Sequence, residues 1–191
     1  MTIDADPMPP APGTSTTAAL RGIPSSLIIG AIALLVVLVS LPRFHAHAVD
    51  ANHQDARISL DVLGAVAFDP ALPDELARLD GPGALLRLVS SVPALAHRFP
   101  DARSAPDTGQ LLHHGYRIDT GFVVEGLESR PALVAWPDEL GRTGDAAFAL
   151  TADGRLFGHE NRGLWSSGAS PLRRVELSDQ GWVELRGPRQ P

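Results

Sequence analysis

Residues 27–41 read LIIGAIALLVVLVSL, and no residue between Arg21 and Arg43 carries a formal charge. At a rise of about 1.5 Å per residue, a helix over residues 22–42 reaches about 31 Å, close to the thickness of a bilayer core. A helix inside a soluble domain usually has a polar face, and this one has none. The pattern predicts a transmembrane helix over residues 22–42, with the lipid bilayer as its partner through Leu27 to Leu41.

The fate of this segment has two interpretations. Ala46-His47-Ala48 fits the small-x-small rule of signal-peptide cleavage, which would remove the segment and leave a secreted domain. The long N-terminal region with only Arg21 as a basic residue, and Arg43 after the apolar run, are atypical of signal peptides. We therefore expect a retained anchor, with secretion after cleavage at Ala48 as the alternative.

The flanking charges barely define an orientation. Arg21 precedes the segment, whereas Arg43 and Arg57 follow it. Positive residues favour the cytoplasmic side, so this count leans slightly towards a cytoplasmic C-terminal domain.

Residues 1–20 and 43–109 flank the apolar run. Residues 1–20 are rich in Pro, Thr and Ala, which predicts a disordered tail. Residues 43–109 form a predicted helical region, in which residues 43–67 continue the first helix, with a kink or junction at Pro42. Three- and four-residue spacing predicts that one helix face packs on a sheet and the other meets water. The packing face comprises Leu41, Phe44, Ala48, Ala51, Asp55, Ile58, Val62 and Ala65, and the wet face comprises Asp50, Gln54, Arg57 and Asp61.

Several short elements follow. Pro73-Asp74-Glu75-Leu76 is a predicted helix start, and Gly81-Pro82-Gly83 a break. Residues 84–92 and 93–99 are predicted helices, and residues 100–109 a polar loop.

Residues 110–186 form the predicted antiparallel sheet region of the same globular domain. Strands are expected at 115–124, 130–136, 146–151 and 155–158, with a hairpin turn at Asp153-Gly154. A further hairpin is expected over residues 175–185. Helices followed by antiparallel strands predict an α+β fold.

Composition excludes some classes of function. The chain has 191 residues and a formal net charge of -6, and its basic residues, all arginine, form no stripe, so nucleic acid is not expected as a partner. Absence of cysteine excludes disulfides, thiol catalysis and cysteine-bound zinc.

Three stretches of the sequence stand out together. They are the exit Leu41-Pro42-Arg43-Phe44, the polar helix continuation 52–60 (NHQDARISL), and the order of motifs across 114–156. Those motifs are His114-Gly115-Tyr116-Arg117-Ile118, Ala135-Trp136-Pro137, Gly141-Arg142-Thr143-Gly144 and the stretch 148–156 (FALTADGRL). Together, these stretches resemble type IV pilins and type II secretion pseudopilins.

The motifs of the sheet region have a structural interpretation. Tyr116 is expected to place its ring under the sheet, and Pro137 to end a strand. Gly141 and Gly144 permit a tight loop. Phe148 and Leu150 are expected to alternate inward.

The resemblance implies a pilin-like shape and a domain outside the cytoplasmic (inner) membrane, in preference to the weak charge count. It also implies other pilin-like or envelope proteins as partners. The chain lacks the usual Phe-Thr-Leu-Ile-Glu processing motif: Gly22 is followed by Ile23-Pro24-Ser25-Ser26-Leu27. Processing after Gly22 and polymerisation are therefore not implied.

Histidines are the first candidates for chemistry. His45 and His47 would point about 200° apart on a helix, so they and His53 are not expected to share a metal ion. His113 and His114 on a strand would face opposite sides of a sheet. We expect solvated histidines and no metal site.

Other candidate sites also favour structural interpretations. His159-Glu160 is not a metalloprotease motif, because position 163, where the second histidine should stand, is glycine. The sequence around Ser166, Ser167 and Ser170 has no Gly-x-Ser-x-Gly nucleophile elbow. Gly81-Pro82-Gly83 does not form a dinucleotide-binding fingerprint. Asp138-Glu139 is expected to be a solvated acidic pair.

Trp165 and Trp182 are expected to cover an open sheet face, with an exposed binding patch as the alternative. We assign no catalytic, cofactor-binding or metal-binding residue. The sequence predicts a non-enzymatic, membrane-anchored, pilin-like protein. The alternatives are an exported binding module unrelated to filaments and an envelope enzyme with an unrecognised site.

Overall fold

The computed structural model describes residues 24–73, 79, 81–165, 172–178 and 181–188. The chain forms two compact units, Met1–Pro42 and Arg43–Pro191. The predicted tail 1–20, the helix start at Asp74 to Leu76 and the serines at 166, 167 and 170 lie outside the described residues.

Helix α1 spans Ser25–Ala67, with Pro42 inside it as the last residue of the first unit. Its large apolar side chains from Leu27 to Leu41 are 44–67% exposed. This helix is long and apolar enough to cross a membrane, with a mean hydropathy of 2.5 in its most apolar window. A membrane anchor and a signal sequence both meet that criterion. The predicted helical continuation over residues 43–67 is confirmed.

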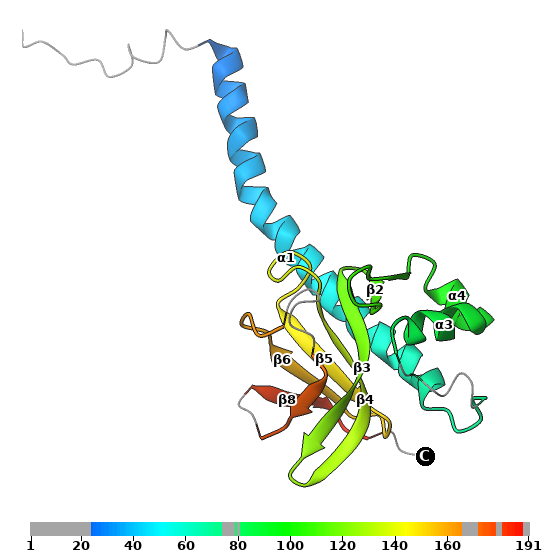
Figure 1. Cartoon of the computed structure of the whole chain (residues 1–191). Helices are drawn as coiled ribbons and strands as arrows, with labels where there is room; N and C mark the ends of the chain where they lie inside the picture. Colours follow the sequence, from blue (N-terminus) through cyan, green and yellow to red (C-terminus); the bar gives the residue numbers. More distant parts are fainter. Residues whose placement is uncertain (1–23, 74–78, 80, 166–171, 179–180, 189–191) are drawn as a thin grey trace, which may run out of the picture. The chain divides into compact units, whose positions relative to one another are not determined.

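The second unit combines short helices with a sheet (Figure 1). Its helices after α1 are α3 (Ala84–Ser91) and α4 (Pro93–Arg98). Its strands are β1 (Arg103–Ser104), β2 (Leu111–His113), β3 (Tyr116–Glu125), β4 (Glu128–Pro137), β5 (Ala146–Thr151), β6 (Leu156–Glu160), β7 (Arg174–Glu176) and β8 (Trp182–Arg186). The α+β prediction is confirmed. Strand β1 lies within the predicted polar loop 100–109 and pairs with β2.

The sheet order is β1-β2-β3-β4-β5-β6-β8, with β7 also paired to β3. All pairs are antiparallel except β3 with β7. The predicted hairpin over residues 175–185 is wrong, because β7 pairs with β3 and β8 pairs with β6. Pairing with β3 places Val175 in an apolar cluster where it is fully buried, which a hairpin with the exposed strand β8 would not provide.

One face of the sheet packs against α1, α3 and α4 (Figure 1). Helix α1 buries Ala56, Leu60 and Leu63 in this core. Of the predicted packing face, Val62 packs against the core and Ile58 is half-buried, but the remainder of that face is not part of it. Phe44 is 71% exposed, and Ala51 and Ala65 are exposed too. The predicted and the observed packing faces both have helical spacing, but only the observed face carries two leucines. Burial of these leucine side chains decides which face of α1 packs on the sheet. Asp50, Gln54 and Arg57 are exposed, as predicted. Asp61 is half-buried and forms an ion pair with Arg186, which corrects the prediction for Asp61.

The predicted sheet residues lie where their motifs place them. Tyr116, Phe148 and Leu150 are buried in the core beneath α1. Strand β4 ends at Pro137. A Cβ atom on Gly144 would collide with the Tyr116 hydroxyl, so the loop needs glycine there.

A second core covers the opposite face of the sheet. It contains Val134, Trp136, Ala149 and Phe157, and Trp165 and Trp182 pack against it. The prediction that these two tryptophans cover a sheet face is confirmed.

Candidate functional site

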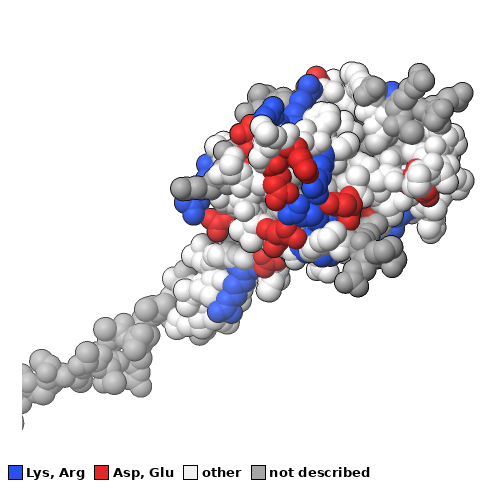
Figure 2. All heavy atoms as spheres, turned by 90° about the horizontal axis from the view of Figure 1, so that it is seen from below, with Lys and Arg blue, Asp and Glu red and all other residues white. Residues whose placement is uncertain are grey.

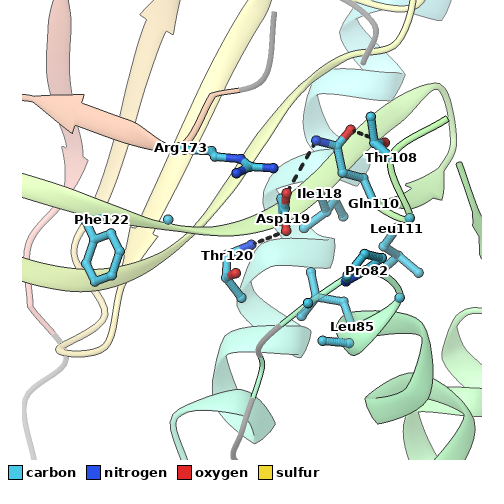
Figure 3. A pocket seen from close by; sticks show the side chains of 15 residues that line it. Pro82, Leu85, Thr108, Gln110, Leu111, Ile118, Asp119, Thr120, Phe122 and Arg173 are labelled. Atoms are coloured by element: carbon cyan, nitrogen blue, oxygen red, sulfur yellow. Dashed lines mark hydrogen bonds between the residues drawn. The ribbon is translucent and has the colours of Figure 1, made fainter. Parts of the chain in front are cut away.

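A pocket of about 380 Å³ lies where one edge of the sheet is interrupted (Figure 3). Strand β2 pairs with β3 as far as Ile118, and β7 pairs with β3 from Phe122 onward. Between these points, residues 119–121 have no partner strand on that edge among the described residues. The break leaves Asp119 and Thr120 half-buried beside the pocket.

Asp119 lies in this break with its carboxylate facing the pocket (Figure 3). Its Oδ1 accepts a hydrogen bond from the Thr120 backbone N–H at 2.8 Å, and its Oδ2 accepts one from Gln110 Nε2 at 3.3 Å. Gln110 is only 3% exposed. Its Oε1 accepts hydrogen bonds from Thr108 Oγ1 at 2.9 Å and from Arg117 Nη1 at 3.3 Å. These donors fix the amide so that its NH₂ group faces Asp119.

Arg117 holds Gln110 and is itself held by two carboxylates. It is 7% exposed, and its Nε donates to Asp138 Oδ1 at 2.6 Å while Nη1 donates to Asp107 Oδ1 at 2.9 Å. The hydrogen bond from Arg117 lowers the pKa of Asp107. Asp138 is therefore the partner of a buried arginine and not a solvated acid, which corrects the prediction for Asp138. Glu139 forms an exposed ion pair with Arg142.

Arg173 lies on the other side of the pocket. Its backbone oxygen accepts the Phe122 N–H at 3.0 Å, and a Cβ atom on Gly121 would lie 2.7 Å from that oxygen. Its guanidinium is exposed and directed towards Asp119 (Figure 3). Within the described residues, this guanidinium forms no ion pair or hydrogen bond.

The predicted break at Gly81-Pro82-Gly83 forms part of the pocket wall, where the Gly83 N–H donates to Gly109 O at 2.8 Å. Sequence reasoning did not identify Gln110, Asp119 or Arg173 as candidates. They come from separate segments and share no motif, so only the fold brings them together.

His113 and His114 do not face opposite sides of the sheet, which corrects that prediction. Strand β2 ends at His113, and His114 has a φ angle of 45°, so the two rings stack with centroids 3.9 Å apart. His114 Nδ1 lies 2.9 Å from Asp55 Oδ2. His113 is 8% exposed, contacts Phe99, and its Nδ1 is buried without a partner in the part of the chain that the structure describes.

His113 makes stability depend on pH. Burial, with a smaller contribution from His114, lowers the pKa of His113 from 6.5 to about 4. The unfolded chain therefore binds a proton on His113 more readily than the folded chain does. The stabilisation of the fold by neutral His113 is complete above pH 6.5 and is lost as the pH falls towards 4. We expect His113→Leu to remove up to about 3 kcal/mol of the acid destabilisation over that range, measured by urea unfolding. The exposed His97→Leu is the control, and an unchanged pH profile in His113→Leu would contradict the account.

Three other histidines, His45, His53 and His159, are held by separate contacts. His45 Nε2 lies 2.8 Å from Gly141 O, and His53 Nε2 lies 3.0 Å from Asp145 Oδ1. Burial is the main cause that lowers the pKa of His53. His159 is buried against Trp165 and Trp182, with ring centroids 5.1 Å away in both cases. Within the described residues, no three histidine or acidic side chains are grouped to hold a metal ion.

Surface charges of both signs alternate on the face seen in Figure 2, without a continuous basic field. Arg155 bridges Glu125 and Glu184, and Arg130 bridges Glu128 and Asp153. These charges are paired within the domain.

Comparisons with protein families, curated proteins and solved structures found no match to this chain.

Proposed function

We propose that this chain is a single-pass, membrane-anchored, pilin-like structural or interaction protein of the cell envelope, with its globular domain outside the cytoplasm and without catalysis. The observation that carries the proposal is the charge-free apolar part of α1, whose large side chains are exposed from Leu27 to Leu41. Exposed apolar surface on this scale needs a lipid or protein partner. A helix of this length satisfies its backbone hydrogen bonds inside a bilayer.

Features of the second unit support the pilin-like part of the proposal. From Arg43 onward, α1 buries Ala56, Leu60 and Leu63 against one face of a mainly antiparallel sheet. A long N-terminal helix packed on such a sheet is what the sequence resemblance implies. No residue of the apolar segment 27–41 belongs to this core.

Self-association through the apolar segment can be tested directly because the chain contains no cysteine. Single cysteines placed in turn from Ala31 to Leu35 cover every face of the helix at about 3.6 residues per turn. On mild oxidation of isolated membranes, we expect disulfide-linked dimers at positions on one face and monomers at the others.

An exposed position in the second unit provides the control. Ala94→Cys on α4 is expected to remain monomeric under the same oxidation. Monomers at every scanned position would argue against lateral association and against the pilin-like part of the proposal.

The second candidate is an exported binding module, released by cleavage after Ala48. The pocket between Asp119 and Arg173 favours binding as a role, and all of its lining residues follow Ala48. A soluble protein that begins at Val49 would support this alternative.

A further inference from the structure

We propose that the pocket between β2 and β7 binds a small zwitterion of the α-amino-acid class, with the ammonium group on Asp119 and the carboxylate on Arg173. Small-molecule binding would be a further role of the second unit, and it does not depend on whether the apolar segment is retained.

Two opposite charges line the pocket without pairing with each other among the described residues. Asp119 and Arg173 point towards each other across the pocket (Figure 3), but no ion pair joins them among the described residues. The simplest structural role for such residues would be a salt bridge, as Arg155 forms with Glu125 and Glu184. A ligand with both charges would bridge the space that separates Asp119 from Arg173.

Asp119 and the backbone beside it offer hydrogen-bond acceptors to a ligand. A carboxylate has about four acceptor positions, and the structure uses two of them, for Gln110 and Thr120. The Phe122 N–H faces the β7 side of β3, so the backbone of Thr120, two residues earlier, faces the same side. The Thr120 carbonyl therefore points into the break, where none of the described hydrogen bonds ends on it. An ammonium group has three donors for these acceptors.

Hydrogen bonds from neighbouring side chains fix the Asp119 carboxylate in place. Asp119 is held by the buried Gln110 amide, which is oriented by Arg117 and Thr108. Arg117 is itself held by Asp107 and Asp138. A carboxylate held in this way loses little conformational freedom on binding a cation. Arg173 offers a planar guanidinium, which pairs well with a carboxylate.

The size and the remaining walls of the pocket suit a small apolar amino acid. Its volume of about 380 Å³ is near the lower end of ligand sites, which span about 300–1,000 Å³. Pro82, Leu85 and Phe122 supply apolar surface beside the charged groups. L-Leucine carries the two charges and an apolar side chain, and glycine carries the charges alone.

Calorimetric titration of the full-length protein in detergent tests the proposal. The probes are L-leucine, glycine, 3-methylbutylamine and 4-methylpentanoate, the last two being leucine without its carboxylate and without its ammonium group. We expect leucine to bind at least about tenfold more tightly than either single-charge analogue. Asp119→Asn and Arg173→Gln are each expected to weaken leucine binding about tenfold or more.

The matched controls are Glu160→Gln and Arg162→Gln, which remove an exposed ion pair elsewhere in the domain. We expect leucine binding to be unchanged in both. Near-identical circular dichroism and tryptophan fluorescence in all variants would show that folding is retained. The proposal is overturned if neither leucine nor glycine binds at millimolar concentration, or if Asp119→Asn and Arg173→Gln bind leucine as the unchanged protein does.

Discussion

Replacement of Leu34 and Val36 by arginine is expected to remove the protein from alkaline-washed membranes. Both side chains lie in the charge-free apolar segment and are more than half exposed. An arginine near the middle of a membrane helix costs about 2.5–3.5 kcal/mol on insertion scales, and each replacement also removes a favourable apolar side chain. The double variant should shift insertion by more than about 5 kcal/mol, which is enough to change the main location of the protein.

A second double variant tests whether release from the membrane depends on where the two charges lie or only on their number. Ala51→Arg with Gln54→Arg adds the same two charges to exposed positions of α1 that follow Arg43. This control is expected to stay in the washed membranes, as measured by immunoblotting of membrane and soluble fractions. Retention of the Leu34 and Val36 variant, or equal release of both variants, would contradict a membrane role for the apolar segment.

Replacement of Leu60 by alanine is expected to cost about 2–5 kcal/mol of the free energy of unfolding. Leu60 is completely buried in the core that joins α1 to the sheet. Truncation removes apolar contacts and leaves a cavity that the surrounding close-packed core can fill only in part. Urea unfolding of the detergent-solubilised protein, followed by the fluorescence of its three tryptophans, measures the change.

Leu127→Ala is the matched control for this cavity. Leu127 lies at the turn between β3 and β4, where its side chain is fully exposed. The same chemical change should alter stability by less than about 0.5 kcal/mol there. Similar losses in the two variants would argue against the observed packing face of α1.

Local sequence patterns predicted the main elements of the fold. The apolar run and its polar continuation predicted α1, and alternation around Phe148 and Leu150 predicted a two-faced strand β5. The packing face of α1 could not be chosen in the same way, because two stripes share the helical period and the tertiary structure selects the one with Leu60 and Leu63.

Non-local pairing limits what the sequence can predict. Residues 175–185 show the alternation and turn residues of a hairpin, yet β7 and β8 each pair with a strand that comes earlier in the chain. The pocket also results from pairing between segments that are far apart in the sequence. Gln110, Asp119 and Arg173 are ordinary polar residues in sequence, and the break between β2 and β7 alone places them around one space.

Determination of the N-terminus and intact mass of the mature protein, taken separately from washed membranes and from the soluble or secreted fraction, tests the membrane anchor most directly. We expect a membrane-bound chain that retains residues 27–41, beginning at Met1 or Thr2, or at Ile23 if pilin-type processing occurs. A soluble or secreted protein that begins at Val49 would contradict the anchor.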